Sequence, residues 1–450
     1  MKHFFLATLF FSSALSTQIL NFQDKSTFKL AYGSCNGWRN RTSDIFKQVL
    51  KDEPDIWLWL GDAAYSDRKL VTRDLQGDPT RNSLTQDEVN YIENRFNASK
   101  FDPYYTQLRE QNKTKILGIW DDHDYGMGNG DVTFKGKDQV RKLYLNFIEE
   151  PNTSMRRNVS HQKGIWEDYL IQLSNNNTIH LVLIDVRSEF NTVSNDRLGD
   201  QQWAWLEETL LRNSNASLTI LASGIQMIPD RTLFLDEWEV FNKGKLFEII
   251  RKVKKVHPKL AKMVLLSGDV HFSQFYFNPC HSETGGVKLI ELTSSGMTHS
   301  AWTQLYCPAS FIEMINPDHW TTDSTYRSPI VNEFNFGLLQ FDTQNRQPDG
   351  AQLHMQIRGM DGQTKIERKV NLSEEGEAMG KRKMCNLLHQ RHRKVIQAIH
   401  TIKLGISDFK SKRGLSLIWS VGFIAFIIST TVSISIRTFT FTASLIKRFT

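Results

Sequence analysis

Four short stretches of the sequence carry side chains that bind metal ions, and each places them beside a glycine or a tryptophan. In chain order they hold Cys35; Asp62 and Tyr65; the run Asp121, Asp122, His123 and Asp124; and Asp269 with His271. Sulfur, phenol, imidazole and carboxylate donors together can bind two cations about 3.5–4 Å apart. Such a pair neutralises phosphoryl charge and turns a bound water into a hydroxide nucleophile. The chemistry that these residues predict is hydrolysis assisted by two metal ions.

The donor atoms suggest how the ligands would divide between two ions. Asp62 is the expected bridge, because it ends a strand in a Gly-Asp turn that lets a cation approach the backbone. The thiolate of Cys35 and the phenolate of Tyr65 favour iron first and zinc second. Asp122 and Asp269 add oxygens suited to a harder ion such as Ca²⁺, Mn²⁺ or Mg²⁺. Six residues are therefore the candidate metal ligands: Cys35, Asp62, Tyr65, Asp122, Asp269 and His271.

Three further residues are candidates for catalysis beside the metals. His123 follows Asp122 directly, so it is free to act as a general acid on the leaving oxygen, with Asp124 orienting its ring. Arg187 either binds substrate phosphate through two hydrogen bonds or forms a structural ion pair.

The apolar runs at 56–60, 116–120 and 263–267 come directly before three of the four stretches. Strands that end in acidic or histidine residues at one sheet edge are how α/β proteins gather a site from distant sequence. Strands are expected at 28–33, 55–60, 115–120, 164–173, 178–186, 218–222, 262–267, 287–292, 336–341, 353–357 and 366–370, and helices at 43–51, 103–111, 138–149, 200–211 and 243–254. Residues 66–102 are expected to be an irregular insertion. This order predicts an α/β fold with two facing mixed β-sheets flanked by helices.

The sequence resembles the alkaline phosphatase D (PhoD-like) family of metallophosphatases. The segments that carry the resemblance run in family order at 33–35, 61–65, 120–126, 198–206, 267–272 and 293–300. The resemblance implies a metallophosphatase domain at 28–375, an α/β sandwich, and hydrolysis of phosphoesters by a metal cluster in which Fe³⁺ occurs with Ca²⁺. The chain is spaced differently from the family pattern after Asp124, which leaves any ligand role for Asn129 or Asp131 open, and it lacks a second arginine after Arg187. Gln226 stands at a place where related enzymes often offer a ligand and is a weak candidate.

The two ends of the chain predict a secreted body with a membrane anchor. Residues 1–16 read as a signal peptide, with an apolar run and a small-x-small cleavage site. Residues 415–436 are uncharged and long enough to span a bilayer as one helix, leaving a short cytoplasmic tail at 437–450. A glycolipid-anchor signal is the alternative for this segment. Eight Asn-x-Ser/Thr triplets precede it, headed by Asn40, Asn97, Asn112, Asn152, Asn158, Asn176, Asn215 and Asn371. We therefore expect a single-pass type I protein whose body is lumenal or extracellular.

Charge is distributed unevenly along the chain. Residues 381–450 hold 13 Lys and Arg against one acidic residue, a net of +12, whereas the whole chain is +6 and residues 1–380 are therefore about −6. The mildly acidic body argues against nucleic acid as a partner, and no nucleic-acid-binding surface is expected. Residues 381–413 predict a basic juxtamembrane helix, which either contacts membrane lipid or forms a solvated stalk.

The cysteines and the pocket residues complete the sequence-based expectations. We expect Cys280 to pair with Cys307 in an oxidising compartment, with Cys385 left over. Residues of the segment near 300–335 either shape the substrate pocket or simply pack: His299, Trp302, His319 and Trp320. The expected function is hydrolysis of a small phosphoester. Two alternatives stay open, a membrane-anchored binding ectodomain without catalysis and a phosphoesterase directed at membrane lipid head groups.

Overall fold

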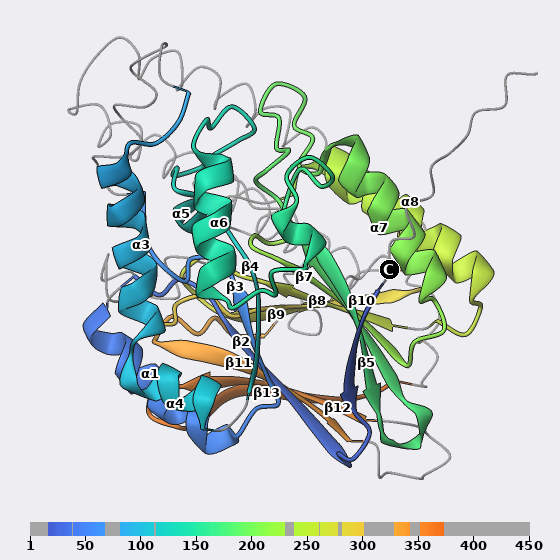
Figure 1. The fold of residues 1–450 in the computed structure, drawn as a ribbon. Coiled ribbons are helices and arrows are strands. Elements are labelled where there is room, and N and C mark those ends of the chain that lie inside the picture. Colours follow the sequence, from blue (N-terminus) through green and yellow to red (C-terminus); the bar gives the residue numbers. More distant parts are fainter. Residues whose placement is uncertain are drawn as a thin grey trace, which may run out of the picture.

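The computed structural model contains two mixed β-sheets that face each other, with helices on both outer sides (Figure 1). The structure describes residues 17–37, 39–67, 82–111, 114–229, 238–260, 262–277, 281–300, 328–342 and 352–372. This arrangement confirms the two facing mixed sheets and flanking helices of the predicted fold class. The proposed signal peptide, basic helix, membrane span and tail all lie outside the described residues. None of the helices within the described ranges combines the length and apolar character of a membrane span.

The first sheet has seven strands in the order β1-β5-β6-β7-β8-β10-β9. Its central strands β6, β7, β8 and β10 are parallel, while β5 runs antiparallel to β6 and β9 antiparallel to β10. The strands are β1 (Gln18–Phe22), β5 (Glu167–Leu173), β6 (Thr178–Ile184), β7 (Leu218–Ser223), β8 (Lys262–Ser267), β9 (Gln274–Phe277) and β10 (Lys288–Thr293).

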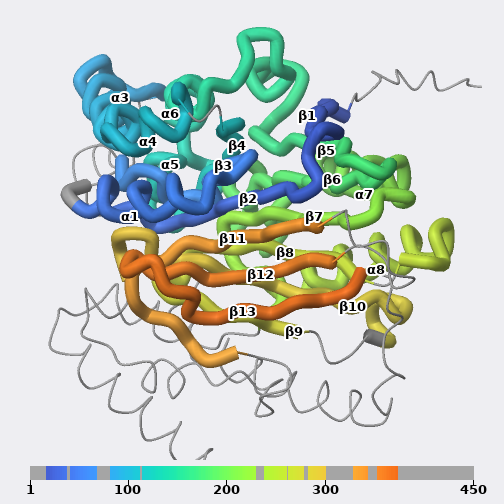
Figure 2. Tube along the Cα trace, turned by 90° about the horizontal axis from the view of Figure 1, so that it is seen from below, coloured from blue at the N-terminus to red at the C-terminus, as the bar shows by residue number. Residues whose placement is uncertain are grey.

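The second sheet has six strands in the order β13-β12-β11-β2-β3-β4. Strands β2, β3 and β4 are parallel, and the three C-terminal strands are antiparallel. Figure 2 shows the orange C-terminal strands β11 to β13 side by side, with β11 next to the blue β2. The strands are β2 (Thr27–Gly33), β3 (Ile56–Leu60), β4 (Lys115–Ile119), β11 (Asn335–Asp342), β12 (Gln352–Gly359) and β13 (Thr364–Asn371).

Alternating side chains of the first sheet pack into two separate cores. On β6, Leu181 and Leu183 join the core that also contains residues of the second sheet, whereas Val182 and Ile184 join the core that contains helix residues such as Leu206. Successive side chains of a strand point to opposite faces, so each face of this sheet is covered by apolar partners. This double burial explains why the central strands read as unbroken apolar runs.

Helices cover the outer faces of both sheets (Figure 1). Helices α7 and α8 lie together on one side and contact each other, while α3 contacts α6 and α1 contacts α4 on the other. The helices are α1 (Arg39–Asp52), α3 (Gln86–Lys100), α4 (Pro103–Glu110), α5 (Asp122–Tyr125), α6 (Lys137–Phe147), α7 (Gly199–Arg212) and α8 (Val240–Val256). Most of them match the helices expected from the sequence within a few residues.

The expectation of an irregular insertion at 66–102 is wrong, because α3 lies within it. Thr85 and Glu88 form a reciprocal capping box at its N-terminus, which satisfies backbone N–H groups that would otherwise lack partners. Ile92 and Phe96 are buried on one face. Most of the remaining side chains of α3 are polar, so its sequence shows only a weak helical pattern of apolar residues. The short edge strands β1 and β9 were likewise not predicted.

Candidate metal centre

The candidate ligands meet where the carboxyl ends of parallel strands from both sheets face each other. Cys35 follows β2, Asp62 follows β3, and Asp122 follows β4 at the start of α5. Asp269 and His271 follow β8 of the other sheet. Loops after parallel strands lie at one edge of a sheet, so two sheets packed face to face bring five residues that are distant in sequence to one place.

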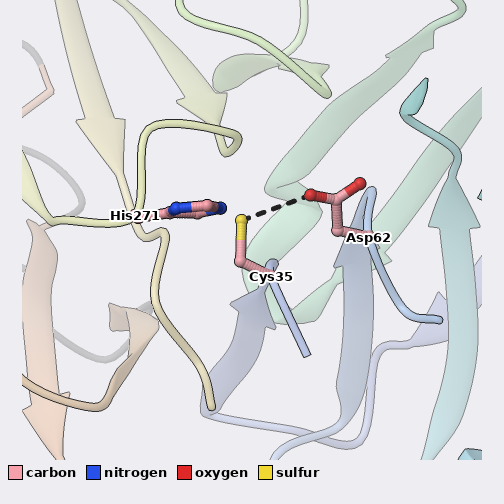
Figure 3. A group of neighbouring side chains, drawn as sticks. All are labelled: Cys35, Asp62 and His271. Atoms are coloured by element: carbon pink, nitrogen blue, oxygen red, sulfur yellow. Dashed lines mark hydrogen bonds between the residues drawn. The ribbon is translucent and has the colours of Figure 1, made fainter. Parts of the chain in front are cut away.

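The distances confirm that these side chains share one site. The Sγ of Cys35 lies 3.5 Å from Oδ2 of Asp62, and the Tyr65 hydroxyl lies 3.2 Å from Nε2 of His271. Figure 3 shows the Cys35 thiol between the carboxylate of Asp62 and the ring of His271. Ligand atoms lie within 4.8 Å of one another in three groups: Cys35, Asp62 and His271; Asp62, Asp122 and His123; and Asp121, Asp122 and Asp269.

Four of these residues hold a backbone conformation that non-glycine residues rarely adopt. The φ angles are 61° at Cys35, 53° at Asp62, 71° at Asp269 and 61° at His271. Such conformations cost about 1–3 kcal/mol each and persist only where the surrounding structure enforces them. Their concentration in the loops after β2, β3 and β8 marks this sheet edge as the place where the chain accepts strain to aim side chains inward.

Glycines allow the loops of the two sheets to approach closely. A Cβ at Gly61, whose φ is +85°, would lie 2.4 Å from the Cβ of Asp121. A Cβ at Gly224, after β7 of the other sheet, would lie 2.9 Å from Cγ of the same aspartate. Any side chain at either position would therefore displace Asp121 and the ligand that follows it.

Buried acceptors at the centre lack hydrogen-bond donors. Among the described residues, Oδ1 of Asp62 and Oδ1 of Asp122 are buried and have no hydrogen-bond partner. Burial, and then the negative charges of Asp122 and Asp121, raise the pKa of Asp62 well above its usual range. Burial and the charge of Asp62 also raise the pKa of the Cys35 thiol. Crowded buried acids of this kind are stabilised by a cation, so the residues fit the metal ions that their types predict.

His123 lies at the more exposed margin of the cluster, and its partner differs from the one expected. Its Nδ1 lies 2.8 Å from Oδ1 of Asp67. Asp124 instead accepts hydrogen bonds from the backbone N–H groups of Ala64 at 3.0 Å and Asp121 at 3.4 Å. The expectation that Asp124 orients the imidazole is therefore wrong, because its oxygens already hold the two loops together.

The charges around the two histidines push their pKa values apart. Burial alone would lower the pKa of His123, yet the charges of Asp62 and Asp122 and the contact with Asp67 raise it to about 11. Burial, followed by the charge of His123, lowers the pKa of His271 to about 4. These shifts favour a protonated His123 and a neutral His271, and the neutral imidazole is the form that binds a metal ion.

Arg187 forms the structural ion pair that was one of its two predicted roles. Its side chain is fully buried, and its Nε donates to Oδ1 of Asp121 at 2.5 Å. The backbone N–H of Arg187 donates to Asp185, which directly follows β6. This pair joins the first sheet to the loop after β4 of the second. Arg187 thus supports the aspartate run from within the protein and does not face the solvent-exposed margin.

The weaker candidates take supporting positions. Asn129 contributes its backbone N–H, not its side chain, to Oδ2 of Asp122 at 2.6 Å. Gln226 donates to the Thr293 hydroxyl at 2.8 Å. His299 places Nδ1 2.6 Å from the Tyr65 hydroxyl. Trp302, His319, Trp320 and the cysteines at 280, 307 and 385 lie outside the described residues.

Sequence reasoning missed two residues of the centre. The Ser295 hydroxyl lies 3.1 Å from Sγ of Cys35 and accepts a hydrogen bond from the backbone N–H of His271 at 2.7 Å. Asp67 contacts His123 as described above. Ser295 belongs to a segment that the family resemblance already included, and Asp67 comes two residues after Tyr65, so each was adjacent to a recognised motif without carrying a signal of its own.

Comparison with known proteins gives a family match over the N-terminal part of the chain. A family model described as PhoD-like phosphatase matches residues 30–127, which include the stretches around Cys35, Asp62 and Asp122. No curated protein matches the chain. A solved structure described as "Structure of PhoD" matches at 16% identity and a TM-score of 0.49, covering 85% of this chain and 79% of that chain. The crystal structure of a 5'-nucleotidase precursor from Thermus thermophilus matches at 9% identity and a TM-score of 0.30, covering 83% and 59%.

The match over residues 30–127 confirms the resemblance to the PhoD-like phosphatases. The matched family is one of phosphatases, and the described residues of this chain include three groups of side chains that could hold a metal ion. Asp269 and His271 lie beyond the matched segment, and the fold brings them to the same site.

Proposed function

We propose that this PhoD-like chain is a metal-dependent phosphoesterase that hydrolyses a small phosphoester at the sheet edge. The observation that supports it best is the convergence of Cys35, Asp62, Asp122, Asp269 and His271 from two sheets around buried carboxylate oxygens that have no donors among the described residues. A binding ectodomain would have no need to gather such an arrangement. The cluster joins soft and hard donors, which suits Fe³⁺ or Zn²⁺ beside Ca²⁺, Mn²⁺ or Mg²⁺.

The protein residues would divide the work of hydrolysis by position. Bound cations would neutralise phosphoryl charge and activate water. Asp62 lies in two of the three groups of ligand atoms, so its carboxylate can serve two ions. Asp122 is fixed by the Asn129 amide, and Asp121 beside it by Arg187. His123, at the exposed margin, would donate its proton to the leaving oxygen as the bond to phosphorus breaks.

The test compares substrates that differ in their need for that proton. His123→Ala should lower kcat about 10²–10⁴-fold for an alkyl phosphoester, while the metal content stays that of the wild type. The loss should shrink for a nitrophenyl ester, whose leaving group departs as an anion. Equal losses on both substrates would remove the acid role from His123. A metal-loaded wild-type protein without turnover on mono- or diesters would contradict the proposed function itself.

The proposed location is the outside of a membrane, with the span at 415–436. Its support is the surface position of the glycosylation triplets. Among the described sequon asparagines, Asn152, Asn158, Asn176 and Asn215 are exposed, and Asn97 and Asn371 are half-buried. Protease added to sealed right-side-out vesicles should leave only a small C-terminal fragment. Protection of an unglycosylated body would place the enzyme on the cytosolic side instead.

A further inference from the structure

The residue that faces the His123 ring comes from a different loop from the one that carries the histidine. Asp67 follows β3, and its Oδ1 lies 2.8 Å from Nδ1 of His123. The Asp67 side chain is 14% exposed and that of His123 is 25% exposed, so the pair lies at the margin where solvent and substrate reach the cluster. A Cβ at Gly128 would lie 3.1 Å from the other carboxylate oxygen, so the loop after α5 closes over Asp67.

Three backbone and ring contacts fix this pairing. The N–H and the hydroxyl of Ser66 both donate to the carbonyl oxygen of His123, at 3.2 Å and 2.7 Å. The ring of Tyr65 lies 3.9 Å from the ring of His123, tilted by 30°. Residues 65–67 therefore hold the histidine by its main chain, by its ring face and by its Nδ1 edge. A ring held in this way has few alternative rotamers.

The position of the carboxylate determines which ring nitrogen is available. The Asp67 carboxylate lies 2.8 Å from Nδ1, so charge attraction favours a proton on that nitrogen and one orientation of the ring, which leaves Nε2 to meet the substrate. Asp124 cannot serve this purpose, because it is fully buried and bonded to the Ala64 and Asp121 amides. Asp124, the aspartate next to His123 in sequence, thus joins two loops, and Asp67, which comes 56 residues before His123, faces the ring.

We propose that Asp67 is the positioning residue for His123, which it orients so that Nε2 delivers its proton to the leaving oxygen. The inference rests on the proposed phosphoesterase function and goes beyond it by assigning Asp67 a role. In the step, a water that has already lost one proton to bulk solvent uses its oxygen to form the bond to phosphorus, and the bond from phosphorus to the leaving oxygen breaks. The Nε2 proton passes to that oxygen, and the resulting neutral imidazole keeps its Nδ1 proton beside the Asp67 carboxylate.

The experiment measures kcat of the full chain for alkyl and nitrophenyl phosphoesters in Asp67→Asn, Asp67→Ala, His123→Ala and the double variant Asp67→Asn/His123→Ala. Asp67→Asn should lower kcat about 10- to 100-fold for the alkyl ester, much less for the nitrophenyl ester, with metal content unchanged. In the His123→Ala background it should cause no further loss. Asp67→Ala removes the side chain's hydrogen bonding altogether and should reproduce the same leaving-group dependence.

A matched control uses Asp131, an aspartate of a neighbouring loop that bonds Thr133 and Thr192 and not the cluster. Asp131→Asn should leave kcat within about twofold of wild type. Suppose that the loss of kcat in His123→Ala depends on the leaving group, whereas Asp67→Asn loses kcat equally on both esters. That result would overturn the role of Asp67 alone. Additive losses in the double variant would do the same. Absence of leaving-group dependence in His123→Ala would overturn the acid role and, with it, this inference.

Discussion

Asp62→Asn should stabilise the metal-free protein while removing its capacity to hold metal. Asp62 is buried, and its Oδ1 has no hydrogen-bond partner among the described residues. Burial and the charges of Asp122, Asp121 and Asp124 together outweigh the attraction of the His123 charge, so the pKa of Asp62 is raised. The substitution removes one negative charge from this group without changing shape. Asparagine also tolerates the φ of 53° at this position, so the backbone conformation is retained. In the metal-free wild type, only protonation of a carboxylate can relieve the same repulsion.

The magnitude follows from the geometry. The ligand atoms lie within 4.8 Å of one another, and two unit charges at that limiting distance repel by about 3 kcal/mol at an effective dielectric constant of about 20. Protonation of one carboxylate relieves part of this repulsion, so we expect a gain of about 1–3 kcal/mol, or a Tm rise of about 2–6 °C for a domain of this size. Because the pKa of Asp62 is raised in the folded state, its contribution is present below about pH 4 and is lost as pH rises. The gain from Asp62→Asn should therefore grow with pH.

The assay is thermal unfolding in EDTA and after metal loading, with Asp185→Asn as the matched control. Asp185 is also a buried aspartate after a strand, but it accepts from the Ile165, Arg187 and Ser188 backbone N–H groups. Its replacement should destabilise the protein by about 1–3 kcal/mol. Metal loading should raise the Tm of the wild type and should not raise the Tm of Asp62→Asn. A lower Tm for Asp62→Asn than for wild type in EDTA would refute the reasoning.

Two further predictions concern the proposed metal ligand Cys35 and the buried carboxyl group of Glu167. Cys35→Ser should weaken the binding of iron or zinc by more than about tenfold and change Ca²⁺ binding little. Metal analysis and calorimetry measure both effects, and an unchanged iron content would remove the thiolate from the ligand set. Burial raises the pKa of Glu167 to about 7, so wild-type stability in EDTA should fall as pH rises from about 4 to about 7. Glu167→Gln should flatten that slope, and parallel pH curves for the two proteins would contradict the assignment.

The strands that carry the ligands were predictable because burial on both faces leaves an unbroken apolar run. Residues 56–60, 116–120 and 263–267 correspond closely to β3, β4 and β8. Their carboxyl ends carry residues whose types alone indicate metal chemistry. The local sequence therefore contained both the elements and the ligands, and the fold class followed from the order of strands and helices.

The interactions between loops were not predictable in the same way. The pairing of Asp67 with His123 depends on how the loop after β3 lies against α5, and the pairing of Arg187 with Asp121 depends on how two sheets face each other. A neighbouring Asp124 was the natural partner for His123 along the chain, but it is bonded instead to backbone amides, one of them from another loop. These pairings are determined by how the loops and sheets pack against one another, and such packing produces no periodic pattern in the sequence.

The candidate ligands are divided between two sheets, with Asp62 after β3 of one and Asp269 after β8 of the other. An ion held by both would be a reversible cross-link closing a loop of about 200 residues, comparable in topology to a disulfide that a chelator can open. Metal supply would then govern how long the folded chain survives proteolysis as well as whether it reacts. The same strained loops that aim the ligands would be the first to open when the ion leaves.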